Sequence, residues 1–272
     1  MNNKFIPMAV LVSITVLLVG CANPYTQFYK SSIGGQPVSN LEGYQPCNTP
    51  VQIVATADMK GGVDELIRQG FVVVGSSQFN AAADALSERN VLAQAQLVNA
   101  CKVLISSAFS HSVSGAVPLI IPNNSTSYTT GRATAYGSGG YANAYGSSTT
   151  TTYGSQTVMM PFTVQRYDAN AVYLVKMQLR FGVRFSPIPQ ALAQRIGRNG
   201  GILLEVVVRG SVAYQADIFE GDVIMAVDGV ALNAENNMEL FNSLLAQKSR
   251  QIVNIEIWRN GEWMTKSVQL LM

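Results

Sequence analysis

The sequence predicts an α+β protein in which a small α/β domain precedes a β-sandwich or partly open barrel with two helices. Strand-type and helical runs alternate from Val51 to Ser106, which favours a partly parallel sheet with helices packed on it. Short apolar runs joined by Asp-Gly and Asn-Gly turns occupy residues 201–271, and this pattern favours antiparallel hairpins. A tract rich in Ser, Thr, Gly and Tyr separates the two regions.

The first residues have the order of an export signal. A basic tip at Lys4 precedes an apolar run from Phe5 to Val19, and a glycine and Cys21 follow. The run is shorter than the roughly 20 apolar residues that cross a bilayer. The segment Leu-Val-Gly-Cys21 resembles a lipobox, which implies cleavage before Cys21 and acylation of that cysteine, for example with palmitate. The alternative is an uncleaved anchor or a chance cysteine.

Two features of the sequence bear on its binding partners and its cellular location: the charge balance and the residue after Cys21. Lys and Arg number 18, Asp and Glu number 16, and they form no basic run, which excludes nucleic-acid binding. Ala22 follows Cys21 where an aspartate would favour the inner membrane in the lipoproteins that this signal resembles. We therefore expect an outer-membrane lipoprotein that faces the periplasm, with display on the cell surface left open.

Composition divides the chain into four parts. Residues 1–20 are the signal, and residues 21–50, rich in Gly, Pro, Ser and Asn, predict a lipidated cysteine followed by a flexible tether. Residues 51–176 form the predicted α/β domain, with a low-complexity insertion at 123–157. Residues 177–272 form the second domain.

Periodicity supplies the elements of the α/β domain. Apolar runs predict buried strands at 51–57, 71–74 and 103–106, and a further strand at 168–177. Val63, Leu66 and Ile67 have helical spacing, and Gly70 is the expected end of that helix. Asn80 is a candidate N-cap for a second, Ala-rich helix that reaches Ala100.

The insertion has too little apolar material for a core of its own. Its flanks, residues 117–122 and 158–162, are apolar and carry prolines, so we expect them to run antiparallel as an edge extension of the sheet. Residues 123–157 then form a mobile tip. The alternative is that tyrosines make the tip a contact surface; they stand at positions 128, 136, 141, 145 and 153.

Once Cys21 carries lipid, Cys47 and Cys101 are the remaining thiols. An even pair in an oxidising compartment is a candidate disulfide. The alternative is two unrelated cysteines, with Cys101 buried where a helix meets a strand. One histidine, His111, and two distant thiols do not supply convergent ligands, so neither a metal nor another cofactor is expected.

The C-terminal region carries an ordered set of motifs: Phe181-Gly-Val, Gly210-Ser-Val-Ala, Gly221-Asp-Val-Ile and Val227-Asp-Gly. In this order they resemble the PDZ domains of bacterial envelope serine proteases of the high-temperature-requirement family, over residues 177–272. One departure is Ala216-Asp-Ile, where these domains usually have Ala-Gly-Leu.

The resemblance implies a binding mechanism. An extended peptide would add to the edge strand after Phe181-Gly-Val and lie against a helix at 236–247, opened by an Asn236/Glu239 capping box. Backbone N–H groups of the loop would receive the peptide's terminal carboxylate. The implied peptide-binding residues are Arg180, Phe181, Gly182, Val183, Arg184, Leu240, Phe241 and Leu244. The apolar ones have an alternative role as ordinary core.

Catalysis is not expected. The sole histidine, His111, has neither a nucleophile elbow nor a serine-protease motif beside it, so the protease part of the family is missing. The sequence therefore predicts a non-catalytic adaptor that captures protein C-termini or extended segments. One alternative is a surface or assembly lipoprotein in which the α/β domain and the Tyr/Gly-rich loop carry the interaction. Another alternative is an unrecognised hydrolase. The sequence does not indicate an oligomeric state.

Overall fold

The computed structural model describes residues 23–233 and 236–271. The predicted lipidation site, Cys21, lies outside these residues. The chain divides into two compact units, one from Met1–Ala108 with Tyr167–Met272 and one from Phe109–Arg166. In the described parts, no helix has the length and apolar character needed to cross a bilayer.

The first unit contains a mixed sheet with the strand order β1-β4-β8-β5-β3 and β2 paired to β8. As predicted, part of it is parallel, because β3 and β5 pair in parallel from Gln52↔Lys102 to Ala55↔Ile105. The strands of this sheet and the helices around it are α1 (Pro24–Gln27), β1 (Tyr29–Ser31), η1 (Val38–Asn40), β2 (Tyr44–Gln45), β3 (Gln52–Ala55), α2 (Met59–Arg68), β4 (Phe71–Ala82), η2 (Ala83–Leu86), α3 (Glu88–Leu97), β5 (Lys102–Pro122) and β8 (Ser155–Met177). Strands β5 and β8 continue into the second unit.

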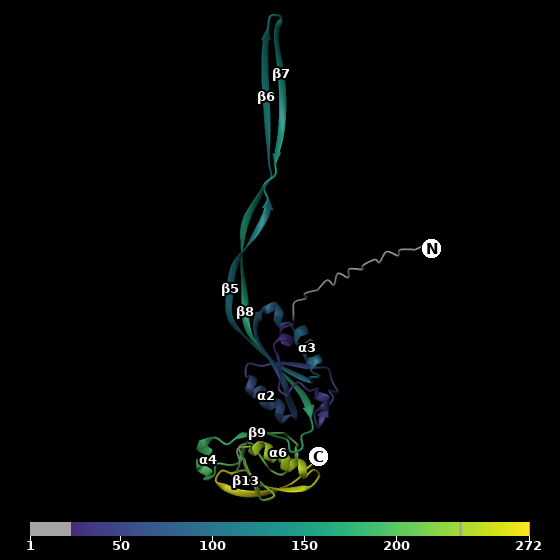
Figure 1. The fold of residues 1–272 in the computed structure, drawn as a ribbon, viewed down its shortest axis with the longest axis vertical. Helices are drawn as coiled ribbons and strands as arrows, with labels where there is room; N and C mark the ends of the chain where they lie inside the picture. Colours follow the sequence, from purple (N-terminus) through teal and green to yellow (C-terminus); the bar gives the residue numbers. More distant parts are fainter. Residues whose placement is uncertain (1–22, 234–235, 272) are drawn as a thin grey trace, which may run out of the picture. The chain divides into compact units, whose positions relative to one another are not determined.

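Helices cover both faces of this sheet (Figure 1). On one face Leu66 of α2 packs with Leu104 and Leu174. On the other, Val91 and Ala95 of α3 pack with a second cluster. Strand residues one position apart belong to opposite clusters, as the alternation of side chains along a strand requires.

The expectation of a flexible tether at 21–50 is wrong for its described part. Tyr25 and Val38 are buried, and β1 pairs with β4 from Tyr29↔Ser77 to Ser31↔Gly75. The side chain of Ser77 donates a hydrogen bond to the carbonyl of Tyr25 at 2.6 Å. Aromatic side chains thus anchor a segment whose composition is otherwise typical of a linker.

The second helix begins later than predicted. Asn80 lies within β4, which runs to Ala82, and α3 starts at Glu88 after Ser87 as its N-cap. Strand pairing with β1 and β8 competes with the helical preference of the alanines at this point and prevails. The structure therefore has a longer strand and a shorter helix than local propensity indicates.

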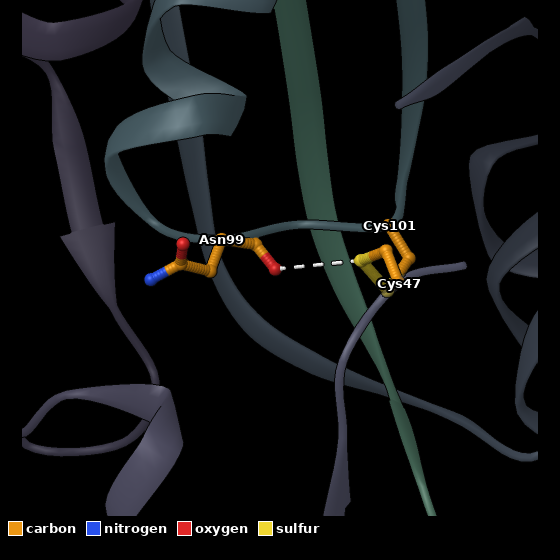
Figure 2. Close-up of a disulfide and its surroundings, with 3 residues drawn as sticks. All are labelled: Cys47, Asn99 and Cys101. Atoms are coloured by element: carbon orange, nitrogen blue, oxygen red, sulfur yellow. Dashed lines mark hydrogen bonds between the residues drawn. A yellow bond between two sulfur atoms is a disulfide. The ribbon is translucent and has the colours of Figure 1, made fainter. Parts of the chain in front are cut away.

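Cys47 and Cys101 form a disulfide (Figure 2). It joins the segment after β2 to the residue that precedes β5, across a sequence separation of 54. The sulfur of Cys47 lies 3.9 Å from the carbonyl oxygen of Asn99. Because a disulfide sulfur has no hydrogen to donate, we treat this approach as packing.

The second unit is a two-stranded ribbon. Residues 123–157 are not a structureless tip: β6 (Ser125–Gly137) and β7 (Gly140–Thr152) pair antiparallel along their full length. The parts of β5 and β8 that lie in this unit, residues 109–122 and 155–166, are its arms. In the arms, Ser114 and Thr163 meet through their hydroxyls at 3.0 Å. A Cβ on Gly115 would lie 2.7 Å from the Phe162 ring. The arms therefore have one hydroxyl-bearing face and one face that carries Phe162.

The C-terminal domain is an antiparallel sheet of order β14-β13-β11-β10-β9, with β12 paired to β11. Its core includes Phe181, Ile224, Phe241 and Ile257. Its elements are β9 (Val183–Pro187), α4 (Gln190–Ile196), β10 (Ile202–Val207), α5 (Val212–Gln215), β11 (Val223–Val227), β12 (Val230–Ala231), α6 (Asn237–Gln247), β13 (Ile252–Arg259) and β14 (Glu262–Gln269).

Two local details of the C-terminal domain bear on the sequence predictions: the N-cap of α6 and the backbone conformation of Asp217. Asn236 is the N-cap of α6, but its side chain makes no capping hydrogen bond, so the predicted capping box does not form. Asp217 stands where the resembled domains have glycine and adopts φ 56°. Aspartate is one of the few non-glycine residues that enter this left-handed region readily.

Candidate peptide-binding site

Strand β9 is the edge strand of the C-terminal sheet. It stands last in the strand order and pairs antiparallel with β10, from Ile202↔Pro187 to Val207↔Val183. The N–H of Val208 donates to the carbonyl of Gly182 at 2.8 Å. In an antiparallel ladder this makes Val183 and Val207 a non-hydrogen-bonded pair. The N–H and C=O of Val183 therefore point away from β10, toward the outer edge of the sheet.

A cavity of about 230 Å³ lies beside this edge. Three parts of the chain form its wall: the loop before β9, β9 itself and α6. The lining residues are Leu179, Arg180, Phe181, Gly182, Val183, Phe185, Phe241, Asn242 and Leu245. The site thus combines unpaired strand donors and acceptors with a mainly apolar hollow.

Aromatic rings form the base of this hollow. The ring of Phe241 on α6 is 5.4 Å from that of Phe181 and 5.7 Å from that of Phe185, both in edge-to-face orientation. Phe181 and Phe241 are only 4% and 1% exposed, so each contributes to the core and to the cavity wall at once. The two roles that the sequence left as alternatives coincide here.

Gly182 is needed for the close approach of the loop to α5. It has φ 81°, and a Cβ at this position would lie 2.2 Å from the Cβ of Ser211. Any side chain there is strained and collides with the N-cap of α5. A variant of Gly182 would therefore report on the fold of the domain as well as on binding.

The structure brings most of the predicted residues together, but not all. Leu240 and Leu244 pack against the domain core and do not line the cavity. Phe185 does line it and was missed. The strand period of two places Phe185 on the same face as Val183, so the signal was present in the sequence.

Arg184 is not a groove residue. Its neighbours Val183 and Phe185 point into the domain, so its own side chain lies on the opposite face of β9. There it pairs with Asp64 of α2 at 2.7 Å and with Glu205 at 3.2 Å. Arg180 lines the cavity, and its guanidinium also bonds to Glu42 at 2.6 Å.

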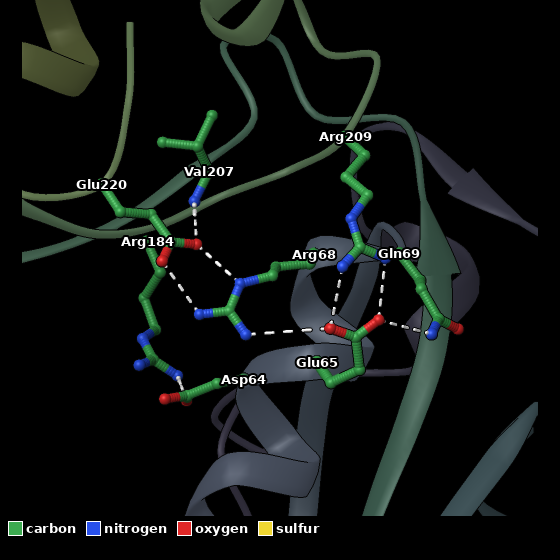
Figure 3. A network of polar contacts seen from close by, with 8 residues as sticks. All are labelled: Asp64, Glu65, Arg68, Gln69, Arg184, Val207, Arg209 and Glu220. Carbon is green, nitrogen blue, oxygen red and sulfur yellow. Dashed lines mark hydrogen bonds and ion pairs between the residues drawn. The ribbon is translucent and has the colours of Figure 1, made fainter.

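Arg184 belongs to a charged cluster that joins α2 to the C-terminal domain (Figure 3). Arg68 donates two hydrogen bonds to Glu220, at 2.7 and 2.9 Å, and Arg209 donates two to Glu65, at 2.8 and 3.0 Å. The backbone N–H of Arg209 also donates to the carbonyl of Arg68 at 2.8 Å. Two parallel hydrogen bonds between a guanidinium and a carboxylate fix the relative orientation of the two groups as well as their distance.

The cluster shifts the titration of its members. The hydrogen bond from Arg68 lowers the pKa of Glu220 below 4.5 and outweighs partial burial, and Glu220 in turn raises the pKa of Arg68. For Glu65, the hydrogen bonds from Gln69 and then from Arg209 lower the pKa. Both carboxylates therefore stay ionised to lower pH than in an unfolded chain.

We expect the contribution of Glu220 to depend on pH. A carboxylate with a lowered folded pKa stabilises the fold above its unfolded pKa, near 4.5, and loses this contribution as pH falls through the folded pKa. Because Glu220 is 37% exposed and water screens the pair, Glu220→Gln should lower the free energy of unfolding at pH 7 by only about 1 kcal/mol or less. The difference should vanish in urea titrations at acidic pH.

The matched control is Glu262→Gln, which removes the same charge from an exposed position on β14. It should leave the unfolding free energy unchanged at both pH values. A difference between wild type and Glu220→Gln that persists below the folded pKa would contradict the assignment of this contribution to the ionised carboxylate.

Comparison with known proteins bears on the C-terminal domain. A model of the PDZ domain matches residues 204–259. The C-terminal domain is PDZ-like. Among curated proteins, no sequence matches the chain.

Several solved structures are similar to part of this chain. An HtrA-type protease with a decapeptide is similar at 19% identity and a TM-score of 0.30, over 37% of this chain and 36% of that one. The HtrA3 PDZ domain bound to a phage-derived ligand has 20% identity and a TM-score of 0.28, over 32% and 80%. An aminopeptidase N family protein from Idiomarina loihiensis has 23% identity and a TM-score of 0.26, over 34% and 13%. The chain spans only about a third of the protease's length.

Proposed function

We propose that this protein is an envelope lipoprotein that captures C-terminal or extended peptide segments through its PDZ-like domain. The observation that carries the proposal is the outer edge of β9 at Val183, which adjoins a cavity lined by apolar side chains. A peptide strand added there would pair with the edge, and its last side chain would enter the cavity. The lipid on Cys21 would hold the captured segment near the outer membrane.

We infer that the protein acts without catalysis. His111 is exposed on β5, and its ring lies 3.1 Å from the hydroxyl of Ser110, the preceding residue. A serine-protease triad requires a histidine oriented by a carboxylate and placed beside a nucleophile in a dry site. An exposed ribbon offers no such environment. Incubation with casein should therefore release no peptides, and cleavage lost in a His111→Ala variant would refute this.

The test of binding is titration of the full chain with a library of peptides that have free C-termini. We expect binding that weakens at least tenfold when the same peptides are amidated, because the loop would no longer receive a carboxylate. The variant Asn242→Trp places a large ring at the cavity wall on the exposed side of α6 and should weaken binding at least tenfold.

The control for bulk on the helix is Gln247→Trp, at an exposed position of α6 outside the cavity wall. It should bind like wild type. If no free-acid peptide binds, or if amidated peptides bind equally well, carboxylate capture is refuted. Membrane attachment is tested separately, since a Cys21→Ser variant should leave the membrane fraction.

A further inference from the structure

The ribbon of residues 109–166 has no core of its own. Every residue from 109 to 163 is exposed, including Val117 at 55% and Met160 at 52%. A two-stranded hairpin alone is marginally stable in water, and three or more strands or a covering layer are needed for independent stability. An exposed apolar surface of this kind also marks an interaction site. The ribbon therefore requires a partner.

The backbone of the hairpin β6–β7 shows where a partner can pair. The N–H of Asn123 donates to the carbonyl of Gly154 at 2.9 Å, so 123↔154 is a hydrogen-bonded pair. Register and alternation then make Ser125↔Thr152 and every second pair beyond it hydrogen-bonded. The intervening residues, among them Thr130 and Ser147, direct their N–H and C=O groups outward. Both edges of the hairpin consequently present regular rows of donors and acceptors.

These edges lack the features that usually prevent pairing with another strand. Natural edge strands are protected by charges, prolines and bulges. Prolines occur in the arms at positions 118, 122 and 161, whereas residues 123–157 contain none. Arg132 is the only charged residue in that tract. Strand pairing through these edges therefore meets little charge repulsion. A highly charged partner would find almost no opposite charge on them to pair with.

A second copy of the chain fits the two edges best. Strands β6 and β7 have the same length of 13 residues and the same hydrogen-bond period. A β6 edge placed beside the β7 edge of another copy repeats the pairing that exists within the hairpin. Arg132 is then next to a strand without charge, whereas β6 beside β6 brings two arginines together.

We propose that the protein self-associates head to tail, with the β6 edge of one copy pairing to the β7 edge of the next. Hydroxyl contacts of the kind seen within the hairpin, such as Thr126 with Thr151 at 3.3 Å and Thr134 with Asn143 at 2.8 Å, continue across this junction. A head-to-tail contact uses two different surfaces, so each added copy leaves one edge of each kind open. The assembly grows beyond a dimer.

The experiment uses sedimentation equilibrium of the full chain in density-matched detergent. Thr130→Pro blocks the β6 edge and Ser147→Pro blocks the β7 edge, and each removes an outward N–H while the bonds within the hairpin remain. Wild type should form species larger than dimers. Each single variant should be monomeric, with association weakened at least tenfold, and a 1:1 mixture of the two should form dimers and nothing larger.

The controls are Thr130→Ala and Ser147→Ala, which keep the backbone donors and should assemble like wild type. Thr126→Pro and Thr151→Pro test the same two edges at independent positions, in case one proline disturbs the hairpin. A monomeric wild type overturns the proposal, and so does a proline variant that assembles as wild type does. Limited proteolysis with and without phosphatidylcholine vesicles tests a lipid partner. If the ribbon is protected only when vesicles are present, and equally in all variants, lipid is the partner instead of a second copy.

Discussion

Replacing Asp222 with alanine should lower the free energy of unfolding by about 4 kcal/mol, because it leaves a buried site without its anion. Asp222 is 1% exposed, and both of its oxygens accept hydrogen bonds from Arg259, at 2.6 and 2.7 Å. One of them also accepts the N–H of Phe219 at 2.8 Å. The truncation removes all three bonds and leaves the Phe219 N–H and part of the guanidinium without a partner. Urea denaturation followed by tryptophan fluorescence measures the loss.

A control on the same hairpin separates this effect from a general loss of charge. Glu262→Ala removes an exposed carboxylate that lies close in sequence to Arg259, and it should change stability by no more than about 0.5 kcal/mol. The double variant Asp222→Leu with Arg259→Met should recover much of the loss, because an apolar pair leaves no unpaired charge. Asp222→Ala that unfolds at the wild-type urea concentration would show that the bidentate pair contributes little.

The turns of the PDZ-like domain were predictable because their residues act locally. Asp228-Gly229 and Asn260-Gly261 were expected to supply the positive φ angles of short hairpin turns. They have φ values of 47°, 78°, 51° and 102°, in that order. Val227↔Val230 and Arg259↔Glu262 close the two hairpins. The physical signal and its consequence lie within four residues, so the sequence alone was sufficient.

The N-terminal segment and the tract were not predictable in the same way. The order of residues 23–50 depends on Tyr25 and Tyr29, whose partners Phe79 and Tyr173 lie far along the chain. The hairpin of β6 and β7 gains its order from backbone pairing between residues of low hydrophobicity. Composition measures neither kind of long-range contact, and on composition alone both segments are therefore expected to be flexible.

For the cavity beside β9, the sequence motif predicted where the site lies. The alternation of side chains along β9 corrected which residues line it. Phe181, Gly182, Val183 and Phe241 are among the peptide-binding residues that the resemblance implies, and all four line the cavity. The position of Arg184 in the motif predicts a peptide-binding role. Because side chains alternate along β9, however, the side chain of Arg184 lies on the opposite face from Val183 and pairs with α2. The pairing partner Asp64 belongs to the α/β domain, and no motif in the C-terminal region indicates it.

Removal of the disulfide should have an effect comparable to that of Asp222→Ala. The Cys47–Cys101 bond closes a loop across a sequence separation of 54, and loop-closure entropy in the unfolded chain predicts a loss of about 4 kcal/mol for Cys47→Ala with Cys101→Ala. A typical domain has a total stability of only about 5–15 kcal/mol. Thr49→Ala, an exposed substitution nearby, should stay within about 0.5 kcal/mol of wild type.

The comparison also tests which state the bond acts on. If the loss arises in the unfolded chain, the double variant should expose more surface on unfolding, and its denaturant slope should rise. Treatment of the wild type with dithiothreitol should then reproduce both the lower midpoint and the steeper slope. A loss under about 1 kcal/mol would mean that the buried contacts of Tyr25 and Val38 hold residues 23–50 in place without the covalent link.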